Sequence, residues 1–202
     1  VYAHYREQQE RIARVHDVLN LLIFGFFCVL VMFEDVVFWI FANKRDCLAI
    51  FPLLMLAVVF TILCEGTVYG NSIARKPWHD TIGIALGAGS NFLLCSLLVP
   101  TLGLSGAALS LAASNGVVFL YRTITGQMYY RTIPSFAKTI SGFLLAFAVT
   151  AIGTLLWQHF VLKFLLVGTI LFIYCTLYRT QLIKLWQMGL GILQGILAKG
   201  NK

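Results

Sequence analysis

A single acidic residue, Glu65, interrupts the apolar run VVFTILCEGTVYG, and Tyr69 follows it four residues later. This spacing places both side chains on one face of a helix, where they would form one polar strip. A carboxylate among apolar side chains is costly unless it is paired, protonated or in contact with water. We therefore expect Glu65 to face protein rather than lipid. It is either a proton, cation or sugar-hydroxyl site, or a structural residue that forms a hydrogen bond between helices or extends toward the nearby cytoplasmic face.

Two amides and two adjacent cations complete the set of candidate pathway residues. Asn91 and Asn115 lie in apolar runs, where amide side chains most often form hydrogen bonds between helices. Arg75 and Lys76 stand between two apolar runs. They either determine the orientation of the chain in a membrane or attract a pyrophosphate group.

The sequence does not indicate enzymatic chemistry. Glu34 and Asp35 are neighbours, so on a helix their side chains point about 100° apart and do not form an acid/base pair across a bond. We interpret them as structural residues near the outer end of a span. No Ser-His-Asp set, glycine-rich phosphate loop or metal-ligand spacing is present, and the five cysteines form no CxxC pair. We expect no enzyme, no cofactor and no metal site.

The composition predicts an all-α integral membrane protein. Of the 202 residues, 59% are hydrophobic and only 11% are charged, whereas soluble domains carry about a quarter charged residues. The net charge of +7 comes from short clusters between apolar runs rather than from a basic patch interleaved with aromatic residues. We therefore expect membrane lipids, and no nucleic acid, as partners.

Six apolar runs reach or approach the roughly 20 residues with which a helix spans a bilayer. They cover residues 18–42, 51–72, 81–100, 104–124, 138–157 and 161–179. If the first residues are cytoplasmic, all Lys and Arg residues lie on the cytoplasmic side except Lys44, Arg45 and Lys163. This bias sets orientation. We expect a bundle of about six transmembrane helices with both ends of the chain in the cytoplasm.

Two tails flank the apolar runs. Residues 1–17 contain i,i+4 pairs of Glu and Arg and no Gly or Pro, which predicts a cytoplasmic helical extension that continues into the first span. Residues 181–202 place most of their apolar side chains on one side. This pattern predicts a cytoplasmic amphipathic helix in the headgroup plane.

A break in the apolar pattern marks a tight turn between the third and fourth runs. Pro100 is expected to end one span at the outer surface, and Gly103 and Gly106 are expected to allow the reversal. Ala107 and Ala108 begin the returning span with small side chains. Small surfaces permit close contact between helices in lipid, so we expect these two spans to pack tightly.

The same region carries a family resemblance, which covers roughly residues 17–130. Nine residues resemble the N-L-LL-L-P-x-x-G-x-x-G-A-A signature of polysaccharide flippases: Asn91, Leu93, Leu94, Leu98, Pro100, Gly103, Gly106, Ala107 and Ala108. The upstream segments FEDVVFWIFANKRDCLAIFPLLMLA and VYGNSIARKP resemble two further parts of that family. The chain departs from the family pattern at Asn43, Cys47 and Glu65. The family exports O-antigen and capsule, and its superfamily includes the MATE drug exporters.

The resemblance implies two helical lobes around a cavity that opens alternately to each side of the bacterial inner membrane. The expected substrate and partner is a polyprenyl-pyrophosphate-linked oligosaccharide. Residues 18–130 would form a flippase-like four-helix region, residues 131–180 two further spans, and a first lobe would precede Val1. A MATE-type drug or metabolite antiporter and a membrane scaffold that transports nothing are the alternatives.

Overall fold

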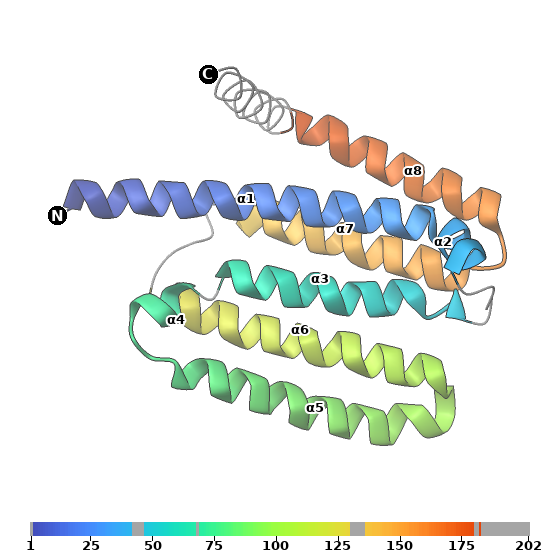
Figure 1. Cartoon of the computed structure of the whole chain (residues 1–202), viewed down its shortest axis with the longest axis horizontal. Coiled ribbons are helices and arrows are strands. Elements are labelled where there is room, and N and C mark those ends of the chain that lie inside the picture. Colours follow the sequence, from blue (N-terminus) through green and yellow to red (C-terminus); the bar gives the residue numbers. More distant parts are fainter. Residues whose placement is uncertain (1, 42–46, 68, 130–135, 180–181, 183–202) are drawn as a thin grey trace, which may run out of the picture.

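The computed structural model describes residues 2–41, 47–67, 69–129, 136–179 and 182. The elements of this part of the chain are α-helices, and the long ones lie side by side in a bundle (Figure 1). They are α1 (Tyr2–Met32), α2 (Glu34–Phe41), α3 (Phe51–Thr67), α4 (Tyr69–Ile73), α5 (Trp78–Leu102), α6 (Leu104–Tyr129), α7 (Phe136–Leu155) and α8 (Phe160–Leu177). The expected all-α fold is confirmed.

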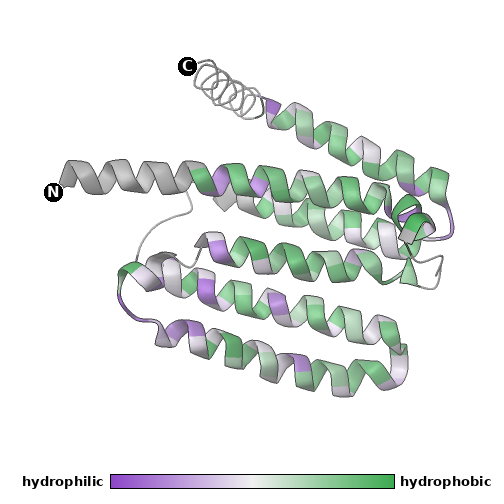
Figure 2. Cartoon of the chain, in the orientation of Figure 1, coloured by the Kyte–Doolittle hydropathy of each residue, from purple (hydrophilic) through white to green (hydrophobic). Residues whose placement is uncertain are grey.

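Several of these helices are long and apolar enough to cross a membrane. Five segments of the described chain meet that requirement: Val15–Met32, Phe51–Ile73, Trp78–Leu102, Leu104–Tyr129 and Phe160–Leu177. A shorter apolar segment, Ile140–Leu155, belongs to α7. Figure 2 shows apolar residues along most of each long helix. Many of these side chains are not covered by protein, which fits a bundle whose outer faces contact lipid.

Helix α3 lies in the interior of the bundle and packs against α1, α6 and α7. Its buried side chains include Leu56, Phe60 and Leu63, which join buried residues of α1, α6, α7 and α8 in one core. Helix α5 lies at the edge and packs against α6. The fold is therefore a set of roughly parallel and antiparallel helices in which α3 and α6 hold the two sides together.

The first predicted span, 18–42, is divided into two helices. Helix α1 ends at Met32, and α2 begins at Glu34 after the single residue Phe33. At the start of α2, Glu34 and Asp35 both accept hydrogen bonds from the ammonium group of Lys163 on α8. The predicted span 18–42 thus contains the end of one helix and a second, short helix. The expected helical continuity between residues 1–17 and the first span is confirmed by α1.

The turn between α5 and α6 is shorter than the sequence predicted. Pro100 does not end the helix, since α5 continues to Leu102. The chain reverses at Gly103, whose φ of 57° is easily adopted only by glycine and whose backbone N–H donates to the carbonyl of Val99. Gly106 is already part of α6 and has another role. A Cβ atom there would lie 2.4 Å from the carbonyl oxygen of Leu98.

The small residues of α6 face protein on two sides, as expected for close helix packing. Ala108 is buried, and Ala107 is half-buried. The glycine at 106 contacts α5, whereas Gly116 faces Phe60 of α3. Because α6 presents glycine at both of these contacts, no side chain of α6 holds the helices apart there. Helix α6 therefore approaches both α5 and α3 closely. The predicted amphipathic helix at 181–202 lies outside the described residues except for Leu182.

Candidate functional site

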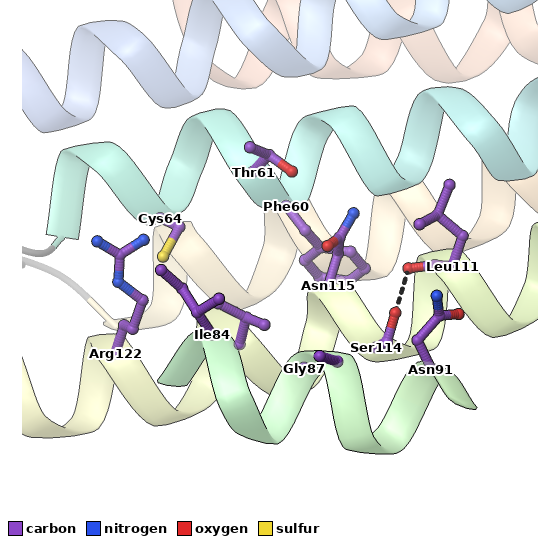
Figure 3. Close-up of a pocket in the computed structure, with 12 residues that line it drawn as sticks. Phe60, Thr61, Cys64, Ile84, Gly87, Asn91, Leu111, Ser114, Asn115 and Arg122 are labelled. Carbon is purple, nitrogen blue, oxygen red and sulfur yellow. Dashed lines mark hydrogen bonds between the residues drawn. The ribbon is translucent and has the colours of Figure 1, made fainter. Parts of the chain in front are cut away.

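A cavity of about 320 Å³ lies between α3, α5 and α6. Apolar side chains form part of its wall, but five polar side chains also line it: Thr61, Asn91, Ser114, Asn115 and Arg122. Figure 3 shows Arg122 near one end of the cavity and Asn91 near the other. Concave sites with a few convergent polar groups are the usual form of ligand-binding sites. This cavity is therefore the candidate functional site.

Arg122 joins the cavity to two acidic residues. Its Nε donates a hydrogen bond of 3.2 Å to Asp80 Oδ1, and its Nη1 lies 3.6 Å from Glu65 Oε1. The Arg122 side chain is only 14% exposed, and its aliphatic stem lies where a Cβ atom on Gly83 would stand. The glycine thus leaves room for the arginine between α5 and α6. The guanidinium group is held in position by Asp80 and contacts Glu65 more loosely.

Glu65 lies beside a charged partner, Arg122. Its side chain is 68% exposed. Glu65 shares the helical face of Thr61, which lines the cavity four residues earlier. Its carboxylate reaches Arg122 from the side of α3. Helix α3 carries Glu65 near its end, beside α6. The expectation that Glu65 faces protein rather than lipid stays a prediction.

The two predicted amides have different surroundings. Asn115 Nδ2 donates a 3.3 Å hydrogen bond to the carbonyl of Ala57 on α3, so the expected contact between helices is confirmed for this residue. The Asn91 side chain accepts a bond from Cys95 one turn later on the same helix. Both amides are half-buried and line the cavity. Asn91 Nδ2 therefore remains the more accessible donor for a ligand.

The turn between α4 and α5 carries the two predicted cations. Arg75 is exposed with a φ of 55°, and Lys76 Nζ donates a 3.3 Å bond to Tyr129 Oη. Neither residue lines the cavity. They lie at the same end of the bundle as Arg122, close to the start of α5 (Figure 1). The side chain of Tyr69 is outside the described residues, so the predicted strip with Glu65 stays a prediction.

A network of hydrogen bonds ties this end of the bundle together. His79 is buried, with Nδ1 3.3 Å from Tyr121 Oη and Nε2 3.1 Å from Tyr129 Oη. Asn71 Nδ2 donates to Asp80 Oδ1 at 3.0 Å. The same carboxylate oxygen therefore receives bonds from Asn71 and Arg122. Asp80 connects α4 to α6 and fixes the arginine at the end of the cavity.

Sequence reasoning did not select Arg122 as a site residue, although a signal was present. Arg122 lies inside the predicted span 104–124, just as Glu65 lies inside the predicted span 51–72. Charged residues within membrane spans usually pair with each other. Matching the two opposite charges at the same end of neighbouring spans would have predicted the contact. Asp80 gave a weaker signal, because it lies just before the predicted third span.

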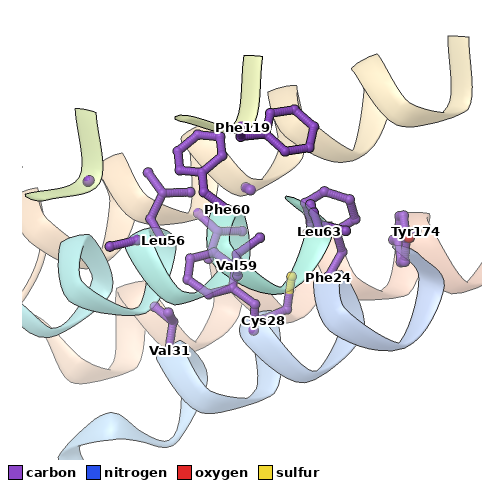
Figure 4. Packing of buried hydrophobic residues seen from close by; sticks show 14 of the residues in the cluster. Phe24, Cys28, Val31, Leu56, Val59, Phe60, Leu63, Phe119 and Tyr174 are labelled. Carbon is purple, nitrogen blue, oxygen red and sulfur yellow. The ribbon is translucent and has the colours of Figure 1, made fainter. Parts of the chain in front are cut away.

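A second, larger cavity of about 790 Å³ lies on the other side of α6, between α3, α6 and α7. Its lining is apolar except for the threonines at 123, 150 and 154. Phe60 borders both cavities, and its ring lies 5.9 Å from that of Phe119 (Figure 4). The packed contact between α3 and α6 separates the two spaces. The amide and guanidinium groups that line these two cavities are therefore all in the smaller one.

Neither a metal site in the described part of the chain nor a relative identifies the chemistry of this cavity. The described residues contain no group of three or more His, Cys, Asp and Glu side chains placed to hold a metal ion. Comparison of the chain with models of protein families, with curated proteins and with solved structures gave no match. The resemblance to polysaccharide flippases thus stays a prediction from the sequence. The geometry of the cavity is the basis for any statement about function.

Proposed function

We propose that this chain is part of a membrane transporter that moves a lipid-linked oligosaccharide across the bacterial inner membrane. The observation that carries the proposal is the cavity between α3, α5 and α6, which places amide, hydroxyl and guanidinium groups among apolar helices. Polar groups inside a membrane are expensive and usually mark a substrate or ion pathway. The flippase-like residues from Asn91 to Ala108 belong to two of the three helices that enclose this cavity.

The lining groups suit the two chemical parts of such a substrate. Asn91, Ser114 and Thr61 offer hydrogen bonds to sugar hydroxyl groups. Arg122 offers charged N–H donors to a pyrophosphate, which guanidinium groups bind in a bidentate manner. The cavity of about 320 Å³ is at the small end of ligand sites. It accommodates one part of the substrate at a time.

Glu65 acts as an exchangeable partner of Arg122 in this proposal. Ion pairs of exposed side chains contribute little, about 0–1 kcal/mol, and Glu65 is 68% exposed. An incoming pyrophosphate therefore displaces Glu65 from Arg122, while Asp80 keeps the guanidinium group in place. When the carboxylate returns, it competes with the substrate and favours release. Glu65 thus sets the balance between binding and release.

The proposed arrangement in the membrane has six spans, formed by α1, α3 with α4, α5, α6, α7 and α8, with both ends in the cytoplasm. The alternating directions of these helices in Figure 1 support it. The charges add further support. All Lys and Arg residues except Lys44, Arg45 and Lys163 fall on the cytoplasmic side of this arrangement, and such a bias sets orientation.

Binding and transport by the complete transporter that contains this chain test this proposal. That protein is placed in lipid vesicles, and a fluorescent polyprenyl-pyrophosphate-linked oligosaccharide is compared with the same oligosaccharide free of lipid. Arg122→Gln is expected to weaken binding about 10-fold or more, because hydrogen bonds to charged groups contribute about 1.5–3 kcal/mol. Asn91→Leu also weakens binding, and it leaves the ion pairs intact. Arg75→Gln serves as the control, since Arg75 lies outside the cavity.

Glu65→Gln tests whether Glu65 competes with the pyrophosphate for Arg122 or has only a structural role. Binding becomes tighter because the competing carboxylate is gone, whereas transport becomes slower because release is slower. Equal binding by the wild type, Arg122→Gln and Asn91→Leu would exclude the cavity as the substrate site. Failure of the wild type to bind any lipid-linked oligosaccharide would favour the scaffold alternative.

A further inference from the structure

Three charged side chains meet at the opposite end of the bundle from Arg122. Glu34 Oε1 accepts a 2.7 Å hydrogen bond from Lys163 Nζ, and Asp35 Oδ2 accepts a second bond from the same ammonium group. The side chains of Glu34 and Lys163 are both 0% exposed, and that of Asp35 is 26% exposed. The sequence assigned Lys163 to the outer side without a partner, and the structure adds that it is buried between two carboxylates.

The charges of this cluster do not balance. One ammonium group faces two carboxylates, which leaves a net negative charge when both acids are ionised. Removing charges from water costs several kcal/mol per ion unless each is paired and hydrogen-bonded. Glu34 Oε2 is buried and has no hydrogen-bond partner among the described residues. Among the described residues, the cluster therefore lacks one positive charge beside Glu34 Oε2.

We propose that Glu34, Asp35 and Lys163 form a proton-binding site that holds α2 against α8. A proton from water adds to Glu34 Oε2 and forms an O–H bond, which makes the Glu34 side chain neutral. Asp35 then remains as the single negative partner of Lys163. The bound proton balances the cluster. Its release leaves an uncompensated buried charge and weakens the attachment of α2.

The surroundings of Glu34 support binding of a proton near neutral pH. Burial raises the pKa of Glu34 to about 7, against a partial opposing effect of Lys163, and the negative charge of Asp35 raises it further. Among the described residues, the charged groups that face Glu34 are Asp35 on α2 and Lys163 on α8. The described side chains of α7 carry no titratable group, and those on α1 near this end include only the thiol of Cys28. His159, one turn before Lys163, is exposed.

The sign of the effect on stability follows from the direction of this pKa shift. Because the pKa of Glu34 is higher in the folded protein than its ordinary value of 4.5, the folded state binds the proton more tightly than the unfolded state. The stabilisation is complete below about pH 4.5 and is lost as the pH rises through about 7. We therefore expect the chain to become less stable as the pH rises across this window. Transport activity is not required for this effect.

Infrared spectroscopy of the purified full chain in detergent tests the proposal directly. The wild type is expected to show a protonated carboxyl band that disappears with a midpoint of about pH 7. Glu34→Gln is expected to abolish this band while retaining the hydrogen bond to Lys163, because the amide oxygen replaces Oε1. Asp35→Asn is expected to move the midpoint to lower pH, since one carboxylate then matches one ammonium group. Thermal unfolding followed over the same pH series is expected to lose its Glu34-dependent slope in Glu34→Gln.

His159→Gln is the matched control, because His159 is an exposed imidazole at the same end of α8, outside the cluster. The band and its midpoint are expected to remain in this variant. Persistence of the band in Glu34→Gln would overturn the proposal, as would a wild-type spectrum without any carboxyl group titrating between about pH 5.5 and 8.5. If Glu34→Gln does not fold, an unchanged midpoint in Asp35→Asn would overturn it instead.

Discussion

Replacing Gly106 by alanine is expected to push α5 and α6 apart. The added Cβ atom would lie 2.4 Å from the carbonyl oxygen and 2.7 Å from the carbonyl carbon of Leu98. These are backbone atoms of α5, so no side chain can rotate away to make room. One of the two helices has to move, and this contact belongs to the most extensive helix pair of the bundle. Overpacking of this kind costs about 1–3 kcal/mol.

Gly89→Ala is the matched control for this change. Gly89 also lies within α5, and a Cβ atom there would meet nothing within 4 Å. Both substitutions gain the helix propensity of alanine, about 0.8–1.0 kcal/mol over glycine. The difference between the two variants therefore isolates the cost of the contact with Leu98, and that difference is expected to be about 1–3 kcal/mol.

Thermal unfolding of the purified chain in detergent measures this difference. For a chain of this size, 1 kcal/mol corresponds to about 2–4 °C in Tm. Gly106→Ala is thus expected to unfold about 2–12 °C below Gly89→Ala. Equal Tm values for the two variants would show that the α5–α6 interface tolerates a wider separation. The reasoning from close backbone contact would then be refuted.

Two other predictions concern the turn and the topology. Gly103→Ala is expected to destabilise the chain by about 1–2 kcal/mol relative to the wild type, because Gly103 has a φ of 57°, which alanine adopts only at a cost. The added Cβ atom meets no neighbour within 4 Å, so this cost comes from the backbone. Thermal unfolding measures it, and a stability equal to that of the wild type would contradict a backbone origin. Arg75→Cys in cells is expected to resist an impermeant thiol reagent that labels Lys44→Cys, since the two positions lie on opposite sides of the proposed membrane arrangement. The reverse labelling pattern would overturn the orientation.

The amino-acid sequence by itself determined where most of the helices lie. Apolar runs of about 20 residues are a local property, and a helix satisfies its backbone hydrogen bonds within each run. The tight reversal between α5 and α6 was also predictable, because Gly103 and the small residues after it restrict the chain locally. The error at Pro100 has a local cause as well. A proline near the end of a helix can stay within it where its missing N–H is tolerated.

Only the tertiary structure decided which charged residues meet. Arg122 could pair with any acid at its end of the bundle, and the placement of α3 and α5 beside α6 selects Glu65 and Asp80. Lys163 and Glu34 are separated by 129 positions in the chain. The residues near a charged side chain in the sequence do not predict its partner, since that contact depends on how whole helices pack. The packing of α8 against α1 and α2 therefore decides that Lys163 lies in a buried cluster. The sequence alone did not predict this cluster or the break after α1.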